Sequence, residues 1–352
     1  MSNKMQEYYL LQAEVLQDVF AGEKDVLHAF SQKHKEASRL CIVGSGSSFY
    51  CAQIAAPFIR QNAGIEVLTL LPGRAEEFAP LPEDLMLLVT QEGKSVNVMR
   101  VADHLEALGK PFSVLTALTE SPTALRAEDC LSMGCGEEKS GPKTKGVTST
   151  LLMLQRLALE LGLARGHLTQ EAYQQKQEAL AADLNAAHSM LEKSLEWVLQ
   201  NEAFFTQAPF CAIISVAPLC FLAQEAALKL VETLYLPTVS YEFEEFIHGP
   251  HCLLGEGFHI VALYHGLPDE DRLRSLCAFA REKGCRVLEI SDQAEANFDG
   301  LQLAPSELEQ GCPVHFLFPF QAASAYLAER MGHDLNRPKF DGFATRLKSK
   351  LY

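Results

Sequence analysis

Two stretches of this chain align without a gap: CIVGSGSSFYCAQIAA at 41–56 and AIISVAPLCFLAQEAA at 212–227. Each begins with a short apolar run, turns, and continues into a helix-favouring segment, which is the pattern of a buried strand followed by a helix. The recurrence indicates two halves built on one plan. The identical positions are Ile42, Ala52, Gln53, Ala55 and Ala56 in the first stretch and Ile213, Ala223, Gln224, Ala226 and Ala227 in the second.

Apolar runs alternate with helical patterns throughout both halves. Parallel strands need helical crossovers, so this alternation predicts an α/β fold with a parallel sheet covered on both faces in each half. Segment 151–200 is polar and helix-favouring, and predicts connecting helices. The predicted strands are 39–44, 65–71, 85–91, 111–117, 130–133, 210–216, 236–240, 259–264, 286–290 and 301–303. The predicted helices include 49–62, 95–108, 221–232 and 271–283.

Composition narrows the class of protein. The chain has 352 residues, 48% hydrophobic, which suits about two globular domains. A net charge of -15 argues against a nucleic-acid partner. The acidic N-terminus is not that of a signal peptide, and no apolar run is long enough to predict a membrane span. Ten cysteines without a CxxC pair indicate reduced thiols in a cytoplasmic protein.

The first chemistry-bearing turn is Gly44-Ser45-Gly46-Ser47-Ser48, between a predicted strand and helix. Helix N-terminal N–H groups and hydroxyls suit a phosphate. A dinucleotide fingerprint would need glycine where Phe49 stands. A simple capped turn is the other alternative, but the second half has Val-Ala-Pro-Leu at 216–219, without hydroxyls. The first half therefore has a glycine- and serine-rich loop that suits a phosphate, and the second half does not.

Two further segments are candidates for binding. Thr90-Gln91-Glu92-Gly93-Lys94-Ser95 also follows a strand and precedes a helix, so it is either a second phosphate loop or an ordinary helix cap. Residues 138–150, EKSGPKTKGVTST, form a basic stretch in an acidic protein. A solvated loop is the alternative there.

A fourth segment combines carboxylates, an amine and an imidazole. Glu225, Lys229 and Glu232 share one helical face, and His248 follows in a His-Gly-Pro turn. A carboxylate and an imidazole are a natural acid–base pair for moving protons on a sugar. The alternatives are a salt bridge on a solvated face and a histidine that serves only the turn.

Together these segments resemble the sugar isomerase (SIS) family, over essentially the whole chain. The likeness includes the isomerase part of glucosamine-6-phosphate synthase and the deglycases of fructosamine and glucoselysine 6-phosphates. It implies two tandem SIS modules, each a three-layer αβα sandwich with a five-stranded parallel, flavodoxin-like sheet. The implied domains are 1–165, with an N-terminal helix and the phosphate site; connecting helices at 166–200; and 201–352, with the catalytic Glu and His and the tail.

The resemblance also implies roles for single residues. The tail Leu347-Lys348-Ser349 is similar to that of the synthase, whose lysine forms a Schiff base. The family's E…TK segment matches Glu138 and Lys145. The implied catalytic residues are Glu232, His248 and Lys348; the phosphate ligands are Ser45, Gly46, Ser47, Ser48, Thr90, Gln91 and Ser95; and the other substrate-binding residues are Glu138, Lys145, Glu225 and Lys229.

Two residues of this chain differ from the synthase pattern, and they change the activity that we expect. Residue 2 is Ser rather than a nucleophilic Cys, so this chain is not expected to take ammonia from glutamine, and Glu92 stands where the synthase has Ser. The expected activity is therefore a deglycase of glucoselysine or fructoselysine 6-phosphate, without a metal or cofactor. Alternatives are a glucosamine-6-phosphate deaminase, an aldose–ketose phosphosugar isomerase, and a non-catalytic phosphosugar sensor. The resemblance implies a homodimer or higher homo-oligomer, with no nucleic-acid or membrane partner.

Overall fold

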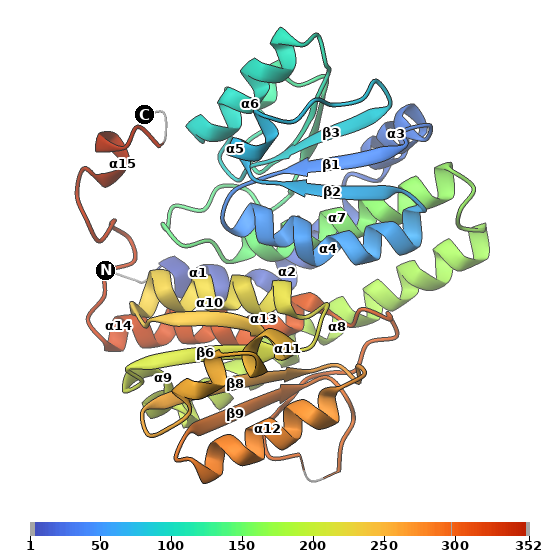
Figure 1. The fold of residues 1–352 in the computed structure, drawn as a ribbon. Coiled ribbons are helices and arrows are strands. Elements are labelled where there is room, and N and C mark those ends of the chain that lie inside the picture. The colour runs from blue at the N-terminus through green and yellow to red at the C-terminus, as the bar shows by residue number, and fades with distance from the viewer. Residues whose placement is uncertain (1–3, 297, 350–352) are drawn as a thin grey trace. The chain divides into compact units, whose positions relative to one another are not determined.

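The computed structural model describes residues 4–296 and 298–349 and divides them into two compact units. Unit 1 contains residues 4–13, Ser140–Thr144 and Ala182–Arg337; unit 2 contains Glu14–Lys139, Lys145–Ala181 and residues 338–349. Each unit holds one five-stranded parallel sheet with helices around it, so the prediction of an α/β fold is confirmed (Figure 1).

The sheet of unit 2 has the strand order β2-β1-β3-β4-β5. All six residues of β3 are buried, as expected for a parallel strand covered on both faces. In Figure 1, α6 lies on one side of this sheet and α4 and α7 on the other. The strands are β1 (Arg39–Val43), β2 (Glu66–Leu70), β3 (Asp84–Val89), β4 (Ser113–Thr116) and β5 (Asp129–Ser132). The helices are α2 (Gln12–Ala21), mostly in this unit, α3 (Lys24–His34), α4 (Ser47–Ala63), α5 (Pro72–Ala75), α6 (Val96–Ala107), α7 (Lys145–Ala164), α15 (Phe343–Arg346) and the 3-10 turn η1 (Ala124–Arg126).

The sheet of unit 1 has the order β10-β9-β8-β6-β7, which repeats the order of unit 2 when its strands are counted from β6. The strands are β6 (Phe210–Ser215), β7 (Thr238–Glu242), β8 (Phe258–Tyr264), β9 (Arg286–Ser291) and β10 (Leu301–Gln302). The helices are α1 (Lys4–Leu10), α9 (Glu202–Thr206), α10 (Cys220–Leu234), α11 (Phe243–Ile247), α12 (Glu270–Glu282), α13 (Pro313–Ala322) and α14 (Ala328–Arg330), with the 3-10 turn η2 (Pro250–Leu253) and the π-helix η3 (Ala323–Leu327).

Segment 166–200, for which connecting helices are predicted, is helical over most of its length. It contains one long helix, α8 (Gln170–Gln200), and the division between the units falls inside that helix, after Ala181. The predicted strand at 236–240 begins two residues later, as β7. Pro237 has no N–H to donate to a ladder, so pairing starts at Thr238.

One helix, α7, has the length and hydropathy of a membrane span among the described residues. Its most apolar window is 83% buried inside the structure, which is the situation of a core helix. All ten cysteines are free thiols, and Cys252 is exposed. The prediction of unpaired thiols therefore agrees with the structure.

His265, directly after β8, makes the stability of unit 1 sensitive to pH. Its Nδ1 lies 2.7 Å from Asp292 Oδ2 and its Nε2 lies 2.8 Å from the Glu309 carbonyl oxygen. Both partners are acceptors, so both ring nitrogens donate and the ring is an imidazolium. The Asp292 carboxylate raises the pKa of His265 despite burial, and Glu270, whose carboxylate accepts from the His265 backbone N–H, adds to this.

We expect stability to fall as pH rises through the folded-state pKa of His265. A group whose pKa is raised by folding stabilises fully below its unfolded pKa, about 6.5 for histidine, and loses this contribution above its folded pKa. The measurement is the urea midpoint of the full chain from pH 6 to pH 9. His265→Gln should flatten this slope, and an unchanged slope in that variant would assign the pH dependence to other groups.

Candidate functional site

The first predicted loop joins β1 to α4 at the carboxyl edge of the unit 2 sheet. Gly46 has φ 55°, and a Cβ at Gly44 would come within 3.0 Å of Ser48 and the Phe49 backbone nitrogen, so the turn needs both glycines. Ser45 and Gly46 are exposed, and Ser47 and Ser48 are half-buried. The loop is therefore open to a ligand.

No side chain caps the N-terminus of α4. The corresponding helix of unit 1, α10, also begins without a side-chain cap, at Leu219. The N-cap position of α4 is Gly46, which has no side chain to cap the helix. The first N–H groups of a 17-residue helix face the loop with a favourable dipole, and this arrangement suits an anion.

The second predicted loop joins β3 to α6, and its hydrogen bonds fix its shape. Thr90 is buried, and its hydroxyl accepts from the Gly93 backbone N–H at 3.3 Å. Ser95 stands at the N-cap of α6 but makes no side-chain cap, so the alternative of an ordinary helix cap is wrong for this residue. β1 and β3 are neighbours in the sheet, so both loops leave the same edge.

The third segment meets the second loop at the N-terminus of α7. The buried carboxylate of Glu138 accepts from the Gly146 backbone N–H at 2.9 Å. A Cβ on Gly146 would lie 2.2 Å from Gln91 Oε1, so the Gln91 side chain lies directly over this glycine. The Gln91 amide also contacts Cys135 Sγ at 3.6 Å. Lys145, the first residue of α7, is half-buried, and a fully solvated loop is not what the structure shows.

The first loop reaches the same helix through Cys51, in the second turn of α4, whose thiol lies 3.6 Å from the Val147 carbonyl oxygen. The second loop, Cys51 of the helix that follows the first loop, and Glu138 thus all contact the first turn of α7 within unit 2. The sequence reasoning missed Cys135 and Gly146. It treated the cysteines as generic buried thiols, and only the glycine directly after Lys145 could have signalled a close approach.

The fourth segment is on α10 in unit 1, and its charges are buried. Lys229 Nζ lies 3.3 Å from Glu225 Oε1 and 2.5 Å from Glu232 Oε1. The side chains of Glu225 and Lys229 are 0% and 1% exposed, whereas that of Glu232 is 31% exposed. The alternative of a salt bridge on a solvated face is therefore wrong.

The three charges act as one electrostatic unit. Burial alone would lower the pKa of Lys229, but the carboxylates of Glu225 and Glu232 outweigh burial and raise it. The Lys229 ammonium therefore remains protonated, and its contact with Oε1 fixes the position of the partly exposed Glu232 carboxylate. A carboxylate fixed this way can take and return a proton.

His248 does not belong to the row of charges formed by Glu225, Lys229 and Glu232. It ends α11, its side chain is 75% exposed, and its Nε2 lies 3.8 Å from Glu244 Oε2. No hydrogen bond or ion pair joins it to Glu232 within residues 4–296 and 298–349. The structure of one chain therefore does not assemble the predicted acid–base pair.

Lys348 is exposed and has a left-handed backbone, with φ 50°. The next residue, Ser349, accepts a hydrogen bond through its carbonyl oxygen from Val96 N–H at 3.2 Å. Val96 begins α6, directly after the second loop. The residue after the predicted tail lysine thus contacts the helix that follows the second predicted phosphate loop, in the same unit.

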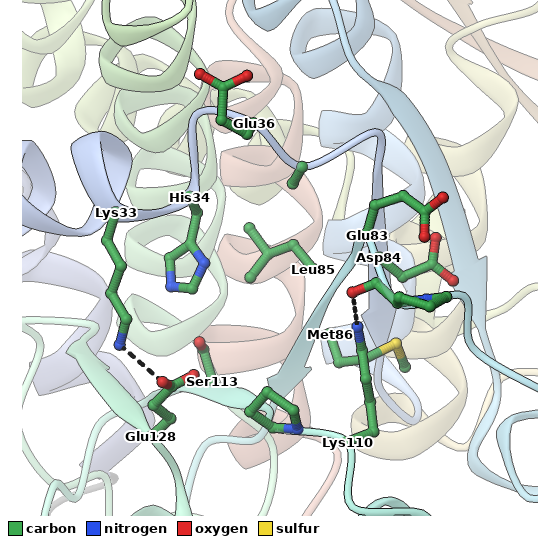
Figure 2. A pocket seen from close by; sticks show the side chains of 13 residues that line it. Lys33, His34, Glu36, Glu83, Asp84, Leu85, Met86, Lys110, Ser113 and Glu128 are labelled. Carbon is green, nitrogen blue, oxygen red and sulfur yellow. Dashed lines mark hydrogen bonds and ion pairs between the residues drawn. The ribbon is translucent and has the colours of Figure 1, made fainter.

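A pocket of about 290 Å³ lies at the opposite, amino edge of the unit 2 sheet (Figure 2). Its cationic groups already have protein partners: Lys33 pairs with Asp129 and Glu128, and Lys110 donates to two backbone carbonyls. Ligands of open parallel sheets bind at the carboxyl edge instead. The loops at that edge are therefore the better candidate. Among the described residues, no group of three or more His, Cys, Asp or Glu could hold a metal ion.

We expect the double variant Ser47→Ala, Ser48→Ala to bind a hexose 6-phosphate at least about a hundredfold more weakly, because each of the two lost hydrogen bonds to a charged group contributes roughly 1.5–3 kcal/mol and about 1.4 kcal/mol is a factor of ten. Calorimetric titration of full-length protein checks this, with the unphosphorylated sugar as the control ligand. Equal affinity of the native chain for the two sugars would contradict a phosphate cradle here.

No family model matches the chain. It is 27% identical over 315 residues to the glutamine–fructose-6-phosphate aminotransferase (isomerizing) of Zymomonas mobilis, which covers 86% of this chain and 51% of that protein. The chain thus spans about half the length of the curated relatives it matches.

Solved structures share the fold over nearly the whole chain. A Clostridium difficile protein provisionally assigned as a phosphosugar isomerase superposes with a TM-score of 0.89 at 24% identity, covering 100% of this chain and 99% of that one. The glucosamine-6-phosphate deaminase of Thermotoga maritima superposes with a TM-score of 0.75 at 19% identity, covering 96% and 97%. Together with the similarity to the aminotransferases, these structures support the resemblance to the SIS family that the motifs predicted.

Proposed function

We propose that this protein hydrolyses an amino-acid-linked sugar 6-phosphate, such as glucoselysine or fructoselysine 6-phosphate, to a hexose 6-phosphate and a free amino acid. The observation that carries the proposal is the Glu225–Lys229–Glu232 row, in which Glu225 and Lys229 are buried and Glu232 is partly exposed. A protein that only senses a phosphosugar needs the phosphate loops, but it has no need for a buried ammonium beside a half-exposed carboxylate.

The proposed reaction balances with water as its only co-substrate. His248 assists ring opening as general acid and base, and Glu232 moves a proton between C1 and C2 through an enolamine. The resulting imine is hydrolysed, which releases the amine and leaves the sugar carbonyl. Because the substrate carries its own nitrogen, a Schiff base on Lys348 is not required, and neither is a metal or redox cofactor.

The phosphate is assigned to unit 2. Its candidate ligands are Ser45 to Ser48 in the first loop, and Thr90, Gln91 and Ser95 in the second. Glu138 and Lys145, beside Gln91 at the start of α7, are proposed to contact the sugar. Binding energy at the phosphate would position the reacting carbons, which is how remote contacts raise a rate.

The equal strand orders of the two sheets support two tandem SIS modules of flavodoxin-like order. His248 is exposed and makes no hydrogen bond to Glu232 among the described residues, which supports a homodimer or higher homo-oligomer in which it serves a neighbouring copy. We propose a cytoplasmic protein without nucleic-acid or membrane partners.

A second candidate is a glucosamine-6-phosphate deaminase, favoured by the fold shared with the Thermotoga maritima enzyme. An aldose–ketose phosphosugar isomerase would use the same proton transfer. The deaminase differs from the deglycase in the amine that its substrate carries, and the isomerase acts on a sugar phosphate that carries no amine. Glu92, in the second loop, is the departure that favours an N-substituted substrate.

The test is an amine-release assay on the full chain with glucosamine 6-phosphate, fructoselysine 6-phosphate and glucoselysine 6-phosphate, identifying the sugar phosphate formed. Lysine release supports the deglycase, with fructose 6-phosphate indicating attachment at C2 and glucose 6-phosphate at C1. Ammonia from glucosamine 6-phosphate alone would replace the deglycase by the deaminase. No amine from any of the three would overturn the proposal.

A further inference from the structure

The last turn of α10, which carries Glu232, is held by a histidine from outside the helix. α10 ends at Leu234, so its final carbonyls lack intrahelical partners. His333 Nδ1 lies 2.9 Å from the carbonyl oxygen of Thr233, the residue next to Glu232. A carbonyl only accepts, so the His333 Nδ1–H donates, and it satisfies one of these end groups.

The chain around this contact holds the imidazole in place. The His333 ring stacks on Tyr235 with centroids 4.2 Å apart and planes inclined by 34°. Tyr235 is the residue at which α10 stops, in the left-handed region with φ 56°. The His333 backbone N–H donates to the Ala328 carbonyl oxygen at 2.8 Å. The ring is therefore fixed both by its own backbone and by the residue that ends α10.

Thr233 is fastened a second time, to the π-helix η3. Its hydroxyl donates to the Lys229 carbonyl oxygen at 2.6 Å and lies 2.9 Å from the hydroxyl of buried Ser324. The Ser324 hydroxyl also lies 3.4 Å from the Lys229 carbonyl oxygen. π-helices are rare and occur frequently at functional sites. The backbone of Lys229 and the side chain of Thr233, on either side of Glu232 in the sequence, are thus both held by a residue from outside α10.

We infer that His333 is a positioning residue for Glu232, acting through the Thr233 carbonyl. Glu232 lies in the last turn of a helix, where ends fray, and its partly exposed side chain has only Lys229 as an ion-pair partner among the described residues. Displacement of a reacting group by about 1 Å can cost about 10²-fold in rate. This inference rests on the proposed function, because it assigns Glu232 the proton transfer.

A matched pair of variants separates the hydrogen bond from the ring. His333→Phe keeps a ring that can stack on Tyr235 but removes the donor. His333→Asn removes the ring, but its amide nitrogen can stand where Nδ1 stands. We expect His333→Phe to lower kcat for amine release about tenfold with KM unchanged, and His333→Asn to keep kcat within about twofold of the native value.

Hydrogen exchange of the peptide 229–236 gives a readout that does not depend on activity. Exchange should be faster in His333→Phe than in the native chain, and near native in His333→Asn. Native kcat and native exchange in His333→Phe would overturn the inference, and so would equal losses in both variants, which would indicate ring packing. If the native chain releases no amine, the proposed function fails, and the exchange comparison still decides whether His333 holds the last turn.

Discussion

Glu232→Gln is expected to lower the rate of amine release by about 10²–10⁴-fold, the range that general acid–base groups contribute. The amide keeps the size of the carboxylate but cannot take a proton from carbon. Affinity for the phosphosugar should change little, because the candidate phosphate ligands belong to loops of unit 2. Steady-state kinetics and calorimetric binding on the same preparation check both statements.

The control for this variant is Glu282→Gln, an exposed glutamate at the end of α12. It removes one negative charge from the same unit and should leave kcat and binding unchanged. Full activity of Glu232→Gln would exclude this carboxylate as the base. Loss of binding together with activity would instead make it a ligand for the substrate.

Lys229→Met is expected to have the largest effect on stability. It leaves the fully buried Glu225 carboxylate without its ammonium, and breaking a buried ion pair by removing one partner costs roughly 3–5 kcal/mol. We expect a correspondingly lower urea midpoint and a protein that expresses poorly at higher temperature. Activity should be lost as well, because Glu232 loses the group that holds it.

The compensating double variant Glu225→Gln, Lys229→Met removes both buried charges and should recover part of the lost stability, because an uncharged pair avoids the desolvation cost. It should not recover activity. If Lys229→Met alone unfolds at the native urea midpoint, the Glu225–Lys229–Glu232 row does not stabilise the fold.

Much of the fold could be predicted from the sequence because parallel strands covered on both faces are apolar runs. β3 and β8 are buried along their whole length, and each begins one residue before its predicted segment, 85–91 for β3 and 259–264 for β8. The repeat at 41–56 and 212–227 marks the start of each sheet. The same strand order then follows in both units.

The candidate site was less accessible to sequence reasoning. Spacing places Glu225, Lys229 and Glu232 on one helical face, but periodicity does not say whether charged residues on that face are buried, and packing against other elements decides it. The contact of Gln91 with Gly146 joins residues far apart in the chain. The π-helix η3 and the hydrogen bond from His333 depend on tertiary packing that local patterns do not encode.

The most direct test of the central claim compares lysine release from glucoselysine 6-phosphate and from fructoselysine 6-phosphate by the native chain and by Glu232→Gln. The account predicts lysine and a hexose 6-phosphate in equal amounts from the native chain with at least one of the two substrates, and neither product above background from the variant. Equal release by both proteins, or no lysine from the native chain with either lysine-linked sugar phosphate, would contradict it.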